Sequence, residues 1–113
     1  MTLEVNGATI AIDNEGYLLD PEDWNEDIAK HIAELENIDL NESAWQVVRM
    51  VRDHYFERQS VPETRIILKK LAAIMGKENA TRKYLYNMFP YGYGQQACKI
   101  AGMRKPLKLM LDL

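Results

Sequence analysis

The chain has 113 residues, 47% hydrophobic and 27% charged, which is the composition of one globular domain rather than of a disordered segment. No apolar run approaches the ~20 residues that cross a membrane, and no leader pattern precedes the first predicted strand, so we expect a cytoplasmic protein without membrane insertion. One cysteine and two histidines exclude an internal disulfide and show no metal-ligand spacing, so we expect no metal and no cofactor.

The net charge of −3 is divided very unevenly along the chain. Residues 1–48 hold twelve acids and one base, a net of −11, whereas residues 49–113 hold five acids and thirteen bases, a net of +8. Such asymmetry indicates a basic surface that meets an anionic partner, either nucleic acid or an acidic protein face. The alternative is that the two halves neutralise each other across the fold.

Two short alternating runs flank the dipeptide Asn6-Gly7, which favours the positive backbone angles of a type I′ turn. The runs span residues 3–5 and 9–12, so we predict a small β-hairpin, with residues 17–19 as a third short strand. So few strands are marginal by themselves and must lie against helices.

Asp20 followed by Pro21 is a typical helix start, with aspartate as the N-cap and proline in the first turn. Apolar residues then recur at three- and four-residue steps, as far as Leu35. This spacing predicts an amphipathic helix over residues 21–36.

Asn41 starts a second helix, and Pro62 ends it because proline disfavours helical geometry in the residue before it. A third helix is predicted over residues 62–75, with Ile74 among its buried residues. Gly76 is its expected C-cap.

Asn79 is expected to cap a fourth short helix over residues 80–89. A glycine-rich turn at 91–94 then leads into a last helical turn within residues 95–101. Beyond Gly102 the chain is predicted to form an arm.

These elements predict an α+β fold that is mostly α. A small N-terminal β-hairpin packs on an orthogonal helical bundle with a helix-turn-helix-like arrangement and a C-terminal arm. Residues 1–102 are predicted to form one domain, with the hairpin in 1–19 and the helices in 20–102, and residues 103–113 form the arm.

The tail carries the most specific motif. Residues 96–102 have the sequence Gln-Ala-Cys-Lys-Ile-Ala-Gly, with Phe89-Pro90 before them and Lys105-Pro106 after them. This tail resembles the C-terminal signature of the DsrC/TusE family of sulfur-relay proteins. That family includes the gamma subunit of dissimilatory sulfite reductase and a component of the relay that thiolates tRNA. Weaker matches upstream extend the resemblance over almost the whole chain, at residues 15–18, 21–24, 45–53 and 85–90.

In that family a flexible C-terminal arm carries a penultimate cysteine that accepts sulfur as a persulfide, and some members have a second cysteine earlier in the tail. Cys98 matches the earlier position, and the carrier position, eleven residues on, is Leu109. The resemblance therefore implies a sulfur-relay or accessory protein that acts through protein–protein interaction and lacks the usual carrier thiol.

Cys98 remains the candidate for sulfur chemistry, as a persulfide or mixed-disulfide site. Nearby Lys99 and Arg104, together with a helix N-terminus near residues 95–97, are expected to favour the thiolate. The alternative is an ordinary buried cysteine. No catalytic constellation or phosphate-binding loop accompanies it, so we expect a sulfurtransferase or sulfur carrier at most, with no self-contained active site.

Two sets of residues are predicted to contact partners. A basic set is expected to meet nucleic acid or an acidic partner: Arg65, Lys69, Lys70, Arg82 and Lys83. An arm set is expected to dock on a protein: Arg104, Lys105, Leu107, Leu109 and Leu111. We expect a sulfur-relay or sulfite-reductase-like protein as the partner, with tRNA or DNA as a further contact. The alternative function is a regulatory helix-turn-helix protein that binds nucleic acid.

Overall fold

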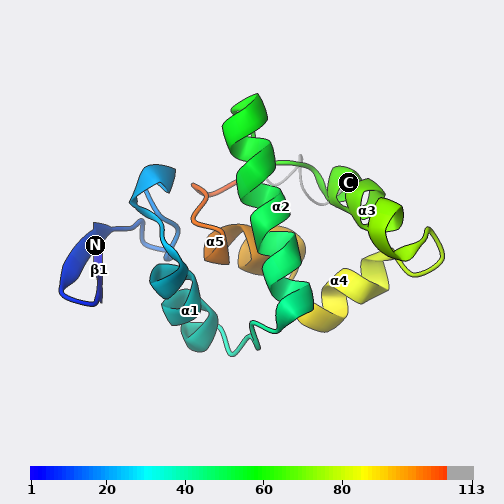
Figure 1. Cartoon of the computed structure of the whole chain (residues 1–113). Helices are drawn as coiled ribbons and strands as arrows, with labels where there is room; N and C mark the ends of the chain where they lie inside the picture. Colours follow the sequence, from blue (N-terminus) through cyan, green and yellow to red (C-terminus); the bar gives the residue numbers. More distant parts are fainter. Residues whose placement is uncertain (107–113) are drawn as a thin grey trace.

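The structure is a computed structural model that describes residues 1–106. Its elements are β1 (Thr2–Val5), β2 (Ala8–Ala11), η1 (Pro21–Asp23), α1 (Glu26–Leu35), α2 (Glu42–Arg58), α3 (Thr64–Met75), α4 (Arg82–Met88), η2 (Tyr93–Ala97) and α5 (Cys98–Ile100). In Figure 1, α2 stands at the centre, with α1 and the hairpin on one side and α3 and α4 on the other. The short α5 packs against both α1 and α2, so the C-terminal segment fills the middle of the molecule.

The predicted N-terminal hairpin is confirmed. β1 and β2 pair antiparallel, and the turn residues Asn6 and Gly7 have φ angles of 51° and 81°, as a type I′ turn requires. The predicted third strand at residues 17–19 is wrong. Only one bridge forms there, between Ile12 and Leu18, because η1 begins almost immediately afterwards.

The helix predicted over residues 21–36 is divided into η1 and α1. Trp24 between them is extended, with φ −76° and ψ 145°. Asn25 then caps α1, because its side chain accepts a hydrogen bond from the Ile28 N–H at 2.9 Å. The break has a tertiary cause: the extended Trp24 directs its indole Nε1 to the Ile100 carbonyl, to which it donates at 2.7 Å.

The second and third predicted helices are confirmed as α2, which Asn41 caps, and α3. α4 begins two residues later than predicted, because the cap is Thr81 rather than Asn79. The Thr81 hydroxyl accepts a hydrogen bond from the Tyr84 N–H at 3.2 Å. Ile74 was predicted inside the fold, but its side chain is 59% exposed.

The tail differs from the predicted glycine-rich turn at 91–94. Residues 93–97 form η2, a single π-helical turn, which continues directly into α5. Such turns insert an extra residue into a helix and are frequent at functional sites. Here the turn leaves both Tyr93 and Cys98 buried.

The core is one continuous cluster that draws on both ends of the described chain. Leu18 and Ile28 from the N-terminal part meet Ile100 and Met103 from the tail, and all four are buried. The tail therefore belongs to the hydrophobic core of this fold. No helix within residues 1–106 is both long and apolar enough to span a bilayer.

Candidate functional site

Cys98 is the first residue of α5 and has no exposed surface. Its thiol hydrogen-bonds with the Tyr93 side chain from the preceding turn. Tyr93 in turn donates its hydroxyl proton to the Pro62 carbonyl at 2.7 Å. The thiol is thus the inner end of a satisfied polar chain rather than a group directed at solvent.

Burial raises the pKa of the Cys98 thiol to about 12 from its ordinary value of 9.0, and the hydrogen bond with Tyr93 only partly offsets this effect. Three pH units lower the thiolate fraction at neutral pH by about a thousandfold. The thiolate is the nucleophile in sulfur exchange. The folded molecule therefore holds Cys98 in its unreactive form.

The expectation of a thiolate favoured by nearby positive charge is wrong. Lys99 is directed away to Glu36, with 3.6 Å between Nζ and Oε2, and its Nζ lies 5.0 Å from the centre of the Tyr17 ring. The N–H of Cys98 already donates to the Tyr93 carbonyl inside the helix, so no free helix N-terminus faces the thiol.

Two side chains from the N-terminal half hold the segment that follows Cys98, and we call this pair, Trp24 and Arg52, the tail clamp. The Trp24 Nε1 donates to the Ile100 carbonyl at 2.7 Å, and the Arg52 Nη1 donates to the Ala101 carbonyl at 2.9 Å. The Arg52 Nη2 also donates to the Pro21 carbonyl at 3.1 Å. The Arg52 guanidinium lies 4.1 Å from the centre of the Trp24 ring, so the two members of the clamp stabilise each other.

The clamp is closed by Gly102. Its φ of 77° lies in the left-handed region, and a Cβ there would overlap the side chain of Trp24. The Arg52 guanidinium also lies 4.9 Å from the centre of the Phe56 ring. Burial lowers the pKa of that guanidinium. Only glycine fits so close to the indole, which explains this residue at the end of the tail motif.

The beginning of the arm is anchored twice. Met103 is fully buried, and its N–H donates to the Cys98 carbonyl at 3.0 Å. Lys105 forms an ion pair with Glu15 at 2.5 Å, and Arg104 between them is exposed. The remaining predicted arm residues lie outside the described part of the chain: Leu107, Leu109 and Leu111.

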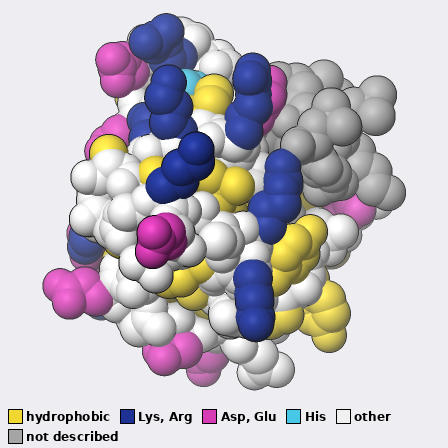
Figure 2. Space-filling model, turned by 90° about the vertical axis from the view of Figure 1, so that its right-hand side faces the viewer, with side chains coloured by type: hydrophobic (Ala, Val, Ile, Leu, Met, Phe, Trp, Pro, Cys, Tyr) yellow, Lys and Arg dark blue, Asp and Glu magenta, His cyan; other side chains and the backbone are white. Residues whose placement is uncertain are grey.

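The basic set is divided between two helices on one side of the molecule. Arg65, Lys69 and Lys70 belong to α3, and Arg82 and Lys83 belong to α4. Figure 2 looks onto this side and shows Lys and Arg side chains gathered there, with hydrophobic side chains between them. The predicted basic residues thus belong to α3 and α4, whereas Cys98 belongs to α5.

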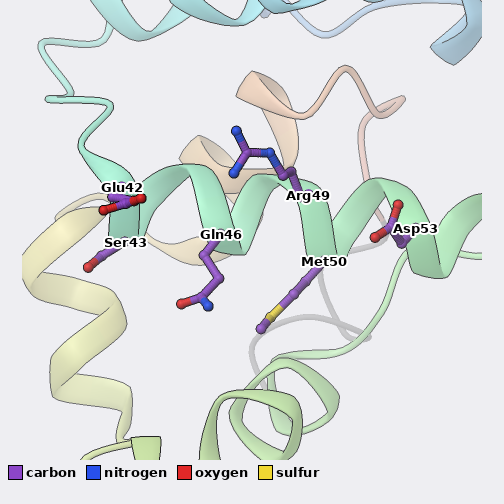
Figure 3. Close-up of a pocket in the computed structure, with 6 residues that line it drawn as sticks. All are labelled: Glu42, Ser43, Gln46, Arg49, Met50 and Asp53. Carbon is purple, nitrogen blue, oxygen red and sulfur yellow. The ribbon is translucent and has the colours of Figure 1, made fainter. Parts of the chain in front are cut away.

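A groove of about 570 Å³ runs along α2 and is separate from the thiol. Its lining comes from one helix: Glu42, Ser43, Gln46, Arg49, Met50 and Asp53. Figure 3 shows Gln46 and Met50 directed toward α3, whereas Arg49 is directed to the opposite side of α2. The lining is mostly polar, and residues 1–106 contain no group of three His, Cys, Asp or Glu side chains placed to hold a metal ion. We assign no chemistry to this groove.

Sequence reasoning missed the tail clamp, although Trp24 and Arg52 are the side chains that position the tail. No local sequence pattern marks either residue, because each donates hydrogen bonds to carbonyls that are far away in the sequence. The only hint was that both residues belong to the weaker family-like matches, at residues 21–24 and 51–53.

Comparison with known proteins covers almost the whole chain. The family model described as DsrC like protein matches residues 4–110. The chain is 41% identical to the sulfurtransferase TusE homolog of Haemophilus influenzae, over 96% of this chain and 99% of that relative. It is 46% identical to the sulfurtransferase TusE of Pectobacterium atrosepticum, over 94% and 97% respectively.

Solved structures show the same architecture. The oxidized gamma-subunit of the dissimilatory sulfite reductase (DsrC) from Archaeoglobus fulgidus matches with a TM-score of 0.85 and 30% identity, covering 95% of this chain and 97% of that one. Allochromatium vinosum DsrC matches with a TM-score of 0.85 and 40% identity, covering 94% and 95%. The chain therefore has the same overall fold as these DsrC proteins.

Proposed function

The chain belongs to the DsrC family of sulfur-relay proteins, and we propose that it serves a sulfur relay by binding a protein partner, without carrying sulfur on an exposed thiol. The expected family and fold class are confirmed. The helix-turn-helix regulator and the tRNA or DNA contact gain no support, because the relatives are named as sulfurtransferases and sulfite reductase subunits. A sulfur-relay or sulfite-reductase-like protein as the partner and a cytoplasmic location are parts of this proposal.

The burial of Cys98 is the observation that carries the proposal. Persulfide formation requires a thiolate that attacks a donor's sulfane sulfur, so that the donor's S–S bond breaks as a new one forms. Cys98 is the one cysteine in the sequence, its thiol has no exposed surface, and burial raises its pKa to about 12. Leu109, at the position where the resemblance implies the carrier thiol, has no sulfur to accept a transfer.

The arm supplies the docking element. Its leucines alternate at two-residue steps, which suits insertion into an apolar groove or addition of a short strand to a partner's sheet. We propose that Arg104, Lys105, Leu107, Leu109 and Leu111 make these contacts. The tail clamp fixes the root of the arm at Ile100 and Ala101, which lowers the conformational entropy lost on docking.

Sulfur chemistry at Cys98 stays a prediction that the folded state does not favour. A persulfide or a mixed disulfide there requires η2 and α5 to open and expose the thiol. Opening also breaks the hydrogen bond from Tyr93 to Pro62 and removes Ile100 from the core. The cost of that opening is why we assign partner binding, rather than carriage, to this chain.

Affinity for a purified sulfur-relay protein of the same organism, measured by titration calorimetry, tests the proposal. Replacing Leu109 and Leu111 by aspartate is expected to weaken binding at least about tenfold, because two apolar contacts are lost. The matched control is Leu35→Asp, a leucine on α1 that is 65% exposed, which should leave the affinity unchanged. Equal affinity of the arm variant and the native chain would contradict docking through the arm.

A further inference from the structure

Basic and apolar side chains share the exposed sides of α3 and α4. Arg65 and Lys69 lie one helical turn apart on α3, and Arg82 and Tyr86 have the same spacing on α4. Tyr86 is 54% exposed, which is high for a residue of this type, whereas the exposed Ile74 lies about half a circumference of α3 away from Arg65. We call this surface the α3–α4 face and define it by five residues: Arg65, Lys69, Arg82, Lys83 and Tyr86.

The segment that contains the α3–α4 face carries a net positive charge. Residues 62–91 contain six bases and two acids, a net of +4. One of these acids, Glu63, is the N-cap residue of α3. Its carboxylate forms an ion pair with Arg65, with 2.9 Å between Oε2 and Nε. In the part of the chain that the structure describes, no salt bridge joins Lys69 or Lys83 to a carboxylate.

The ion pairs that do connect the two halves lie elsewhere. Lys99 with Glu36, and Lys105 with Glu15, join the tail to the N-terminal half. Among residues 1–106, the ion pairs that join the two halves therefore lie at the tail and involve neither Lys69 nor Lys83. The nearby His54 is consistent with a positive field, because burial, and then the cations of its neighbours, lower the pKa of its imidazole.

We propose that the α3–α4 face docks an acidic protein surface with an apolar centre, as a second contact with the partner held by the arm. This inference rests on the proposed function. The exposed ring of Tyr86 is suited to an apolar counterpart, and tyrosine and arginine are enriched at the centres of protein interfaces. Figure 2 shows hydrophobic side chains lying among the cations on this side.

The bounded shape of the positive surface favours a protein over a nucleic acid. The α3–α4 face lies within residues 62–91, which carry a net charge of +4, while residues 1–48 carry a net charge of −11. A long phosphate backbone that continued past the α3–α4 face would approach this acidic half, whereas a compact acidic patch would not. Charge complementarity of this kind mainly increases the association rate and the salt dependence of binding.

The first experiment uses two probes on the ¹⁵N-labelled full chain, followed by NMR. One probe is a synthetic peptide of alternating glutamate and leucine, and the other is an RNA duplex of the same net charge. The peptide is expected to shift amide signals of α3 and α4 and to bind at lower concentration than the RNA. Tighter binding of the RNA, or peptide-induced shifts confined to other elements, would overturn the proposal.

The second experiment compares two double variants that reverse the same number of positive charges, one on the α3–α4 face and one elsewhere. Lys69→Glu with Lys83→Glu should weaken peptide binding at least tenfold, because two cations of the α3–α4 face become anions. Lys30→Glu with Arg49→Glu makes the same net change at exposed sites on α1 and α2 and should have little effect. Tyr86→Ser should weaken binding without changing its salt dependence. An equal loss in both double variants would mean that only net charge matters, and would sink the idea of a specific face.

The same variants separate this inference from the function on which it rests. If the sulfur-relay partner requires Leu109 and Leu111 but tolerates Lys69→Glu with Lys83→Glu, the second contact is refuted and the arm remains. If the partner binds neither native chain nor variants while the peptide still binds the α3–α4 face, the proposed function fails and the docking surface stands.

Discussion

Cys98 shows how one residue can keep its place in a motif and still lose the usual reactivity of its type. Its position in the tail was evident from the sequence. Its burial was not, because the π-helical turn that directs Tyr93 and Cys98 inward follows from the packing of α5 between α1 and α2. Counting charges around a thiol predicts its pKa poorly when its neighbours, such as Lys99, have partners elsewhere.

The raised pKa of Cys98 has a consequence for stability. In the unfolded chain the thiol ionises near its ordinary pKa of 9.0, whereas in the folded chain burial raises that pKa to about 12. Its contribution is therefore fully present below pH 9 and is lost as the pH rises toward 12, because deprotonation favours the unfolded state. At pH 10 the loss amounts to about 1 kcal/mol.

Urea unfolding at pH 8 and pH 10 measures this loss. The native chain should lose more free energy of unfolding between the two pH values than Cys98→Ser does, by about 1 kcal/mol. Burial is the largest cause that raises the pKa of Tyr93, and both chains share that burial, so most of this contribution cancels in the comparison. Identical pH dependence of the two chains would show that the thiol is not held in a desolvated site.

At the scale of elements, the predictable features are those set by adjacent residues. Asn6-Gly7 defines its own turn, and Asn41 caps α2 through a hydrogen bond to the Ala44 N–H. The features that sequence reasoning missed depend on distant parts of the chain. The break at Trp24, for example, is decided by the Ile100 carbonyl, which no local pattern reveals.

The tail clamp is the element-scale feature with the clearest energetic consequence. Arg52→Lys should lower the free energy of unfolding by about 1–3 kcal/mol, because a single ammonium cannot reproduce the two hydrogen bonds to carbonyls or the stacking on Trp24. Arg49→Lys is the control, because Arg49 is exposed and its guanidinium lies 5.5 Å from the centre of the Trp45 ring. It should change stability by less than about 0.5 kcal/mol.

Hydrogen exchange should locate the effect of the Arg52 variant. Amide protection at Gly102 and Met103 is expected to fall more than protection in α3, because the clamp holds the tail and not the distant helices. A uniform loss of protection would instead indicate global destabilisation with no special role at the tail.

At the scale of the whole molecule, the charge asymmetry of the sequence was the useful signal, but its meaning required the fold. The sequence left open whether the two halves neutralise each other. Among residues 1–106, the ion pairs that join the two halves lie at the tail, through Lys99 and Lys105, and involve neither Lys69 nor Lys83. The same arrangement holds the root of the arm close to the N-terminal half.

The central claim is that this DsrC-family chain acts by binding and does not carry sulfur. Incubation of the native chain with polysulfide, followed by intact-mass measurement with and without a reductant, tests it most directly. We expect an unchanged mass for the native chain, whereas Leu109→Cys in a Cys98→Ser background should gain a sulfur atom that the reductant removes. A reductant-sensitive sulfur on Cys98 of the folded native chain would contradict the claim.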